Sequence, residues 1–283
     1  MFGSRAGDKA ADRLSDFDLA VEGLPIGAGA ISQASRELRG KVDIVRVESA
    51  TPALRWGIAH SRIIVPPVAL ADAAMFRSRP PLPDSLAGMR IRAAAELIRE
   101  VGAASVIDFG CGHGWLLAEL VGDAEIEGLT GVDFSPDAIT ATRRRIARAL
   151  GPAGAEKTKL QEGIFTHRDP FFLDHDAATA LEVIEHLDAP QLDAFVGVLF
   201  DYVRPARAVL TTPNVEYNVV WFTHRPNGRR HPDHRFEWSR AEFAKWAGKI
   251  AAAHRYQVRI RPVGSVHPTW GPPTQLAVFD RCE

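Results

Sequence analysis

Two glutamates and a histidine stand close together after an apolar segment. Glu182, Glu185 and His186 follow the letters ATAL, which are typical of a buried strand. A helical turn that begins at Glu182 would direct all three side chains towards one point, because residues three and four apart share a helix face. Buried carboxylates in such a cluster repel one another or take up protons unless a cation neutralises them. This donor set suits Mn²⁺, Mg²⁺ or Co²⁺ at least as well as Zn²⁺.

An E-x-x-E-H string alone is more often the solvated start of a helix, where acids lie near the positive end of the helix dipole. Its position after a strand favours a binding site, since ligands in open α/β sheets bind at the carboxyl ends of the strands. Apolar neighbours would also bury the carboxylates; they are Leu181, Val183, Ile184 and Leu187.

A glycine-rich turn marks a second candidate site. Asp108 follows the apolar letters SVI, and Gly110, Gly112 and Gly114 come at alternate positions before a helical pattern. Glycines let the backbone turn sharply and approach a bulky ligand at a helix N-terminus. A dinucleotide-binding loop has the spacing G-x-G-x-x-G, whereas this spacing after an acid resembles motif I of S-adenosylmethionine-dependent methyltransferases. Asp133 ends the next strand, where a carboxylate can accept hydrogen bonds from both ribose hydroxyls of an adenosyl group.

Four separated strings resemble a single family. They are EVIEHL, TTPNVEYN, RRHPDHRFEW and GPPTQLAVF, and they occur in this order. Together they resemble the small-RNA 3′-terminal 2′-O-methyltransferases, in the form found in bacterial RNA repair. The resemblance covers roughly residues 87–283. It implies a class I S-adenosylmethionine-dependent methyltransferase fold, which is Rossmann-like with a mainly parallel sheet.

The resemblance also assigns roles to residues. It implies that the metal ligands are Glu182, Glu185, His186 and His234, and that His231 lies nearby as a spare imidazole. It implies that the S-adenosylmethionine contacts are Asp108, Gly110, Gly112, Asp133, Gly163 and Ile164. Relatives tend to carry a small polar residue where this chain has Ile164.

The chemistry implied is methyl transfer to the 2′ hydroxyl of the terminal nucleotide of an RNA with a free 3′ end. A divalent ion that binds both the 2′ and the 3′ oxygen lowers the pKa of the 2′ hydroxyl and orients it. A neutral imidazole, either metal-bound or His231, would receive the proton. The expected partner is a polynucleotide kinase-phosphatase repair protein. The alternative is a non-catalytic module for RNA ends, or a nucleotidyltransferase that acts with a partner.

Basic and aromatic residues near the third string are candidates for RNA contacts. Four arginines could hold backbone phosphates, although a solvated loop gives the same pattern: Arg225, Arg229, Arg230 and Arg235. Phe222, Tyr217 or Trp238 could stack on the end base, but aromatics in such strings more often lie in the core.

The N-terminal segment resembles a truncated minimal nucleotidyltransferase domain. The residues that carry this resemblance are Gly3, Ser4, Asp16, Asp18 and Asp43. Three acids around two metal ions suit nucleotidyl transfer, and Gly3-Ser4 would hold a triphosphate. Domains of this kind begin with a helix and a strand before the Gly-Ser turn, and we expect that strand to be missing here. The alternative to a catalytic fragment is a degenerate docking domain.

Composition bounds these interpretations. Lys and Arg number 34 against 35 Asp and Glu, so no overall charge attracts RNA or a membrane, and RNA must be bound by a local patch. No apolar run approaches the roughly 20 residues of a membrane span, and two cysteines exclude a disulfide-rich fold, so we expect a cytoplasmic protein. Two Pro-Pro pairs predict a linker, which gives the division 1–65, nucleotidyltransferase-like fragment; 66–86, linker; and 87–283, methyltransferase domain.

Overall fold

The computed structural model describes residues 17–21, 42–46, 84–221 and 228–282. The chain divides into two compact units, Met1–Ser85 and Leu86–Glu283. Two strands of the first unit are described, β1 (Phe17–Val21) and β2 (Val42–Arg46). They pair in parallel with Asp18 opposite Asp43. Gly3, Ser4, Asp16 and most of the predicted linker lie outside the described residues, so the nucleotidyltransferase-like fragment stays a prediction.

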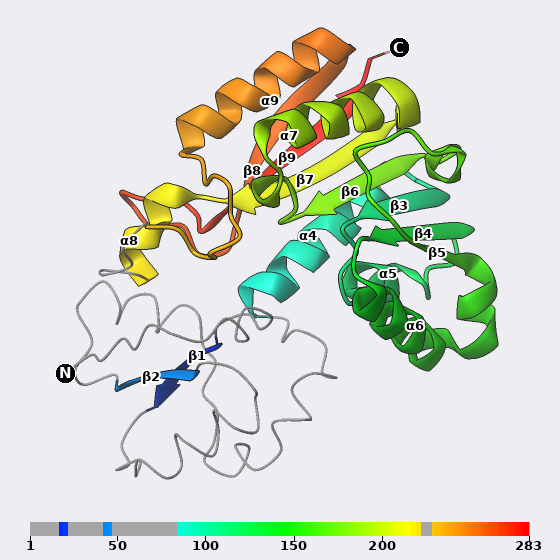
Figure 1. Cartoon of the computed structure of the whole chain (residues 1–283), viewed down its shortest axis with the longest axis horizontal. Helices are drawn as coiled ribbons and strands as arrows, with labels where there is room; N and C mark the ends of the chain where they lie inside the picture. The colour runs from blue at the N-terminus through cyan, green and yellow to red at the C-terminus, as the bar shows by residue number, and fades with distance from the viewer. Residues whose placement is uncertain (1–16, 22–41, 47–83, 222–227, 283) are drawn as a thin grey trace. The chain divides into compact units, whose positions relative to one another are not determined.

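A seven-stranded sheet forms the centre of the second unit (Figure 1). Its strand order is β5-β4-β3-β6-β7-β9-β8. All neighbours are parallel except β9, which runs antiparallel to both β7 and β8. The mainly parallel, Rossmann-like sheet of the sequence prediction is therefore confirmed. The strands are β3 (Ser105–Phe109), β4 (Gly128–Asp133), β5 (Thr158–Glu162), β6 (Ala177–Leu181), β7 (Arg207–Pro213), β8 (Tyr256–Val263) and β9 (Thr274–Arg281).

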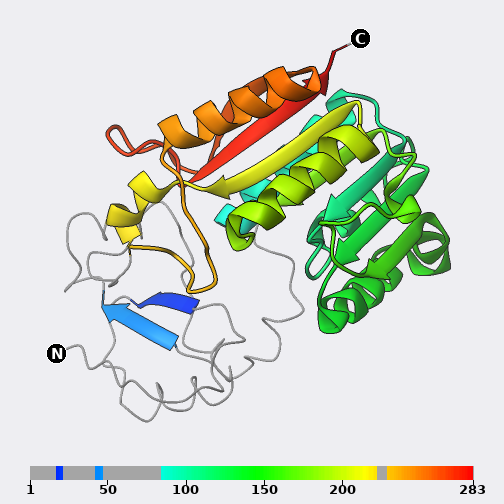
Figure 2. The same ribbon diagram turned by 45° about the horizontal axis from the view of Figure 1, so that its top comes forward.

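Helices cover both faces of this sheet (Figures 1 and 2). One buried cluster joins α7 and α9 to one face, and a second joins α4, α5 and α6 to the other. Helix α4 stands directly after the predicted linker and was not among the predicted elements. The helices are α4 (Leu86–Glu100), α5 (Trp115–Leu120), α6 (Pro136–Lys157), α7 (Ala189–Val196), α8 (Asn218–Trp221) and α9 (Arg240–His254).

Side-chain caps fix where the helices begin. Ser135 accepts a hydrogen bond from the backbone of Ala138 at the start of α6, and Asp188 and Ser239 form capping boxes with Gln191 and Glu242. Such caps satisfy backbone N–H groups that have no partner inside the helix. The first residue of each helix is thereby fixed relative to the strand that precedes it. None of the helices in the described part of the chain is long and apolar enough to cross a membrane.

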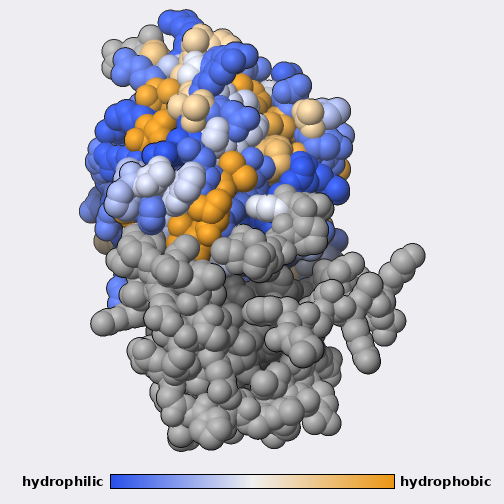
Figure 3. All heavy atoms as spheres, turned by 90° about the vertical axis from the view of Figure 1, so that its left-hand side faces the viewer, coloured by the Kyte–Doolittle hydropathy of each residue, from blue (hydrophilic) through white to orange (hydrophobic). Residues whose placement is uncertain are grey.

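The face of the second unit that Figure 3 shows is largely hydrophilic, with apolar side chains among the polar ones. Several large apolar side chains are exposed after strands, in α8 and in the segment between β8 and β9; they include Phe134, Ile164, Val219, Val266 and Trp270. The first two follow neighbouring strands of the sheet, and the last two lie between β8 and β9. Single exposed apolar residues are ordinary, so their positions matter more than their number.

Candidate functional site

The glycine-rich turn has the backbone shape that the sequence predicted. Gly110, Gly112 and Gly114 have φ angles of 68°, 53° and 71°, which L residues with side chains rarely adopt. A Cβ at Gly110 would lie 2.6 Å from a methyl of Val183, and one at Gly114 would lie 2.5 Å from a methyl of Thr142. Two of the three positions therefore require glycine for space as well as for conformation.

Asp133 holds this turn in place. Its carboxylate accepts hydrogen bonds from the backbone N–H of Gly112 at 2.8 Å and of Ser135 at 2.9 Å. Each carboxylate oxygen can accept more than one hydrogen bond, so the predicted contact with ribose hydroxyls remains open to it. The acid that was predicted to bind the cofactor also shapes the cofactor loop.

Asp108 lies beneath the turn and is almost fully buried. The hydroxyl of Thr179 donates to its Oδ1 at 2.6 Å. Burial raises the pKa of Asp108 to about 7, the Thr179 hydrogen bond opposes this rise, and the charge of Asp133 adds to it. The carboxyl group of Asp108, in β3 just before the turn, is therefore partly protonated near pH 7.

Two exposed apolar residues stand beside the adenosyl side of this site. Ile164 follows β5 and is 59% exposed, while Phe134 follows β4 and is 72% exposed. Their strands, β5 and β4, pair with each other, and Asp133 lies opposite Glu162. The N–H of Gly163 donates to the carbonyl of Asp133 at 2.9 Å. Two apolar side chains at adjacent strand ends suit a flat aromatic ring. Sequence reasoning named Ile164 and missed Phe134, which directly follows the acid.

The acidic cluster is built on an unusual backbone turn. Glu182 has a φ of 57°, in the left-handed region, and only Ile184–His186 form a short 3₁₀ turn. The predicted helical turn that begins at Glu182 is therefore wrong. The backbone of Glu182 is fixed by hydrogen bonds to the carbonyl and the hydroxyl of Thr211, at 3.1 and 3.0 Å. A strained residue of this kind persists only where its surroundings hold it.

The two glutamates lie together and are incompletely satisfied. Glu182 Oε2 accepts from Arg90 at 2.8 Å, and Glu185 Oε2 accepts from Thr212 at 3.1 Å. Within the described residues, the Oε1 atoms of both glutamates are buried and have no hydrogen-bond partner. Burial raises the pKa of Glu185 well above its ordinary value, and the charge of Glu182 raises it further. Buried oxygens without partners are costly, and a bound cation would stabilise them.

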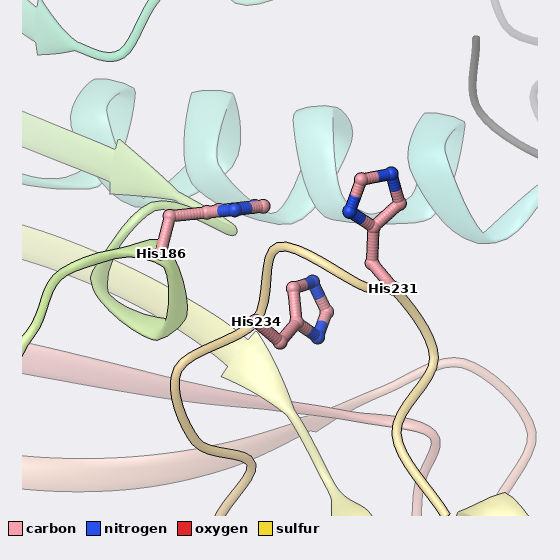
Figure 4. A group of neighbouring side chains, drawn as sticks. All are labelled: His186, His231 and His234. Carbon is pink, nitrogen blue, oxygen red and sulfur yellow. The ribbon is translucent and has the colours of Figure 1, made fainter. Parts of the chain in front are cut away.

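Three histidines form a neighbouring group (Figure 4). His186, His231 and His234 each offer a ring nitrogen, and these atoms all lie within 4.8 Å of one another. The structure brings His186 and His234 together as predicted and adds His231, whereas neither glutamate belongs to this group. Removal from water lowers the pKa of His186, the charges of His234 and His231 lower it as well, and together they bring it to about 4. His186 is therefore neutral near pH 7, the form in which imidazole binds metals.

A buried carboxylate orients His234. Glu237 Oε1 lies 2.5 Å from His234 Nδ1, and the side chain of Glu237 has no exposed surface. A carboxylate only accepts, so Nδ1 carries the proton and Nε2 keeps its lone pair. Figure 4 shows a ring nitrogen of His234 directed towards the gap between His186 and His231. The backbone N–H of Arg230, at 2.6 Å, and the amide of Asn218 also donate to Glu237.

The basic loop divides into structural and exposed arginines. The guanidinium of Arg230 donates to Asn218 Oδ1 and to the carbonyls of Asn214 and Pro273, so it holds chain segments together where phosphate binding was expected. Arg229 donates to the carbonyl of His234 at 2.7 Å and remains exposed. Arg235 is exposed, and its N–H donates to the carbonyl of Glu185. Arg225 and Phe222 lie outside the described residues.

Sequence reasoning missed three supporting residues and judged two aromatics correctly as core candidates. The missed residues are Arg90, Thr212 and Glu237, of which Thr212 and Glu237 lie in strings that drew attention. Tyr217 is buried, and Trp238 stacks on Phe236 with ring centroids 4.1 Å apart. Neither ring is available as a free stacking surface.

Comparison with known proteins agrees with this geometry. Residues 107–208 match the family model of a methyltransferase domain. The crystal structure of the methyltransferase domain of bacterial CtHen1 is 38% identical, covering 69% of this chain and 100% of that one, with a TM-score of 0.62. The chain belongs to the small-RNA 2′-O-methyltransferase family.

Other members of this family are longer than the chain. The small RNA 2′-O-methyltransferase of Xenopus tropicalis is 36% identical over 62% of this chain and 49% of its own length. The structure of the small RNA methyltransferase HEN1 is 31% identical over 72% of this chain and 27% of its own, with a TM-score of 0.65. The chain thus spans about half the length, or less, of these relatives. The S-adenosylmethionine-dependent methyltransferase fold is shared by all of them.

The buried carboxyl of Asp108 predicts a pH-dependent stability. Between about pH 4 and pH 7 the unfolded chain ionises this group while the folded chain keeps it protonated, so stability falls as pH rises through this window. Asp108→Asn should therefore raise the free energy of unfolding above pH 7 by on the order of 2 kcal/mol and change it little below pH 4. Urea unfolding of the ligand-free protein at several pH values measures this. An equal effect at all pH values would contradict the assignment.

The contact between Glu237 and His234 predicts a loss of metal affinity. In Glu237→Gln, the side-chain amide can either accept from Nδ1 or donate to it, so the tautomer of His234 is no longer fixed. We expect Mn²⁺ to bind about 10- to 100-fold more weakly, as is usual when such outer partners are removed. Calorimetry measures the affinity, and ¹⁵N chemical shifts of the histidine rings report the tautomer without metal.

Asn218→Ala is the matched control for this substitution. It removes another hydrogen bond of Glu237 and leaves its contact with His234 in place. It should lower stability and keep the metal affinity close to that of the unsubstituted chain. Equal Mn²⁺ binding by Glu237→Gln and the unsubstituted chain would show that Glu237 does not orient a ligand.

Proposed function

We propose that the chain transfers the methyl group of S-adenosylmethionine to the 2′ hydroxyl of the 3′-terminal nucleotide of RNA. The observation that carries this proposal is that the segment packed against Gly110 holds two buried glutamate oxygens without hydrogen-bond partners among the described residues, together with His186, which belongs to a group of three imidazoles. Family membership supports it, because the relatives are small RNA 2′-O-methyltransferases. A role in RNA repair, in the cytoplasm and with a polynucleotide kinase-phosphatase as partner, belongs to the same proposal.

A divalent cation, Mn²⁺, Mg²⁺ or Co²⁺, is part of the proposal. The residues that would hold it are Glu182, Glu185, His186 and His234. They fit a cation because two buried carboxylate oxygens have no partner and His234 has its Nε2 free. When bound, such an ion lowers the pKa of a ribose hydroxyl and holds the adjacent oxygen.

The chain's own residues do the remaining work. The glycine-rich turn and Asp133 hold the cofactor. Arg90, in helix α4, comes 92 residues before Glu182 in the sequence and keeps its carboxylate in position. His231 stands beside His186 and His234, and its Nδ1 accepts a hydrogen bond from the backbone of Asp233 at 3.2 Å. Its place in this group of imidazoles makes His231 the proton acceptor of our proposal.

The first prediction of this proposal concerns the end of the RNA. Labelled methyl from S-adenosylmethionine should reach a short RNA with free 2′ and 3′ hydroxyls in the presence of Mn²⁺. An RNA with a 3′-phosphate, or with a 2′-deoxy terminal nucleotide, should accept at least about 100-fold less, because the first has its 3′ oxygen esterified and the second lacks the oxygen that accepts the methyl group. Equal methylation of the 3′-phosphorylated RNA would contradict the proposed substrate. RNA binding without transfer would instead favour the non-catalytic module.

The second prediction separates the two histidines of the basic loop. His234→Ala should abolish Mn²⁺ binding at micromolar concentration. It removes the imidazole that Glu237 orients, so that two carboxylates and one imidazole remain as ligands. His231→Ala should keep the Mn²⁺ affinity within a few-fold and lower the rate of methyl transfer. Calorimetry and single-turnover transfer measure the two effects. The reverse outcome would make His231 a ligand in place of His234.

A further inference from the structure

The loop between β8 and β9 is rigidly folded. His267 and Gly271 form a β-bridge, with N···O distances of 2.7 and 2.9 Å between their backbones. The N–H groups of Thr269 and Trp270 both donate to Nδ1 of His267, at 3.1 and 3.2 Å. Arg240 adds a hydrogen bond to the carbonyl of Thr269. The loop therefore presents its side chains in one defined arrangement.

Two aromatic rings lie side by side on this loop. Trp270 is 37% exposed, and its ring lies nearly parallel to that of His267, with an interplanar angle of 27° and centroids 6.5 Å apart. Val266, in the same loop, is 57% exposed. Residues 264–273 contain no Asp, Glu, Lys or Arg. The loop thus offers a flat, uncharged surface to the solvent.

Hydrogen bonds connect this surface to the proposed metal ligands. The amide of Asn214 donates to the carbonyls of Trp270 and Pro272, both at 2.8 Å. Arg230 donates to the carbonyl of Asn214 and, through its backbone, to Glu237, which holds His234. The loop also lies beside α8, past the end of β7, in both ribbon views (Figures 1 and 2). A fixed geometry between the aromatic surface and His234 follows.

The charges around the loop suit a polyanion. Glu216 is the nearby acid, and Arg240 neutralises it with contacts of 2.8 and 3.2 Å. On the other side of the network, Arg229 and Arg235 are exposed. A nucleic-acid base needs a flat ring to stack on, whereas its phosphates need nearby cations. A protein partner would need a larger continuous apolar area than two rings and a valine provide.

We propose that Trp270, supported by His267, is a stacking platform for an unpaired base near the 3′ end of the bound RNA. This inference rests on the proposed function, since it assumes that RNA is the substrate. Stacking would hold the last nucleotides in register with the ribose site while it tolerates any base, because every base has a π face. The platform contributes RNA affinity, and it does not contact the cofactor.

The test is a double-mutant cycle between the protein and the RNA. Binding of a fluorescent RNA to the full chain, with S-adenosylhomocysteine present, is measured by anisotropy for the unsubstituted chain and Trp270→Ala. The substitution should weaken RNA binding about 5- to 100-fold, as for other base–aromatic stacks. A series of RNAs carries one abasic nucleotide at each of the last few positions in turn. For the unsubstituted chain, the abasic nucleotide should weaken RNA binding at one position of the series. At that position it should not weaken RNA binding by Trp270→Ala any further.

Controls separate stacking from folding and from the function itself. Trp270→Phe should keep most of the affinity, and Ile260→Ala, which removes an exposed apolar side chain from β8, should keep all of it. An unchanged melting temperature and an unchanged S-adenosylhomocysteine affinity exclude misfolding of a variant. If Trp270→Ala fails these checks, the abasic series with Trp270→Phe decides whether residue 270 stacks on a base. Equal RNA binding by Trp270→Ala and the unsubstituted chain overturns the platform alone. Absence of RNA binding by the unsubstituted chain overturns the proposed function.

Discussion

The buried contact between Glu237 and Arg230 holds the candidate site together. Glu237 accepts from the backbone of Arg230, while the guanidinium of Arg230 donates to Asn218 and to the carbonyls of Asn214 and Pro273. These partners come from the end of β7, from α8 and from the β8–β9 loop. Backbone hydrogen bonds also join these segments, such as that from the N–H of Asn214 to the carbonyl of Pro273 at 3.0 Å, and the side chains add further connections. His234 is oriented by the same carboxylate, to which its Nδ1 is bound.

The two glutamates of the candidate site have too few positive charges around them. Glu182 and Glu185 are buried beside each other, and Arg90 contacts only Glu182. Arg90 comes from α4, which brings its charge to the site from 92 residues away in the sequence. Among the described residues, Arg90 leaves the Oε1 atoms of both glutamates without hydrogen-bond partners. This imbalance is the physical reason for the divalent cation of our proposal.

Local spacing predicted the parts of the structure that depend on neighbouring residues. Glycines at alternate positions after a strand predicted the turn at Gly110, and the resemblance of four separated strings to one family predicted the mainly parallel sheet. The turn at Glu182 was not predictable, because its left-handed backbone depends on Thr211 in the neighbouring strand. Arg230 was misjudged for a similar reason: its carbonyl partners are backbone groups, which the sequence does not distinguish. The role of His231 remains a prediction, because its ring nitrogen lies in the same group as those of His186 and His234.

Environment separates the acids of this domain into different chemical roles. Asp108 is buried with one hydroxyl donor, and its pKa rises to about 7, so its carboxyl group is partly protonated near pH 7. Burial also raises the pKa of Glu237, but hydrogen bonds from His234, Arg230 and Asn218 outweigh it and hold that pKa below its ordinary value. Glu237 is therefore a permanent anion that can fix a histidine tautomer. Glu185 is buried with one side-chain donor, Thr212, which does not outweigh burial and the charge of Glu182, so its charged form is disfavoured unless a cation binds nearby. The number of donors around each carboxylate, more than its depth, decides which of them supports the fold and which is left to bind a ligand.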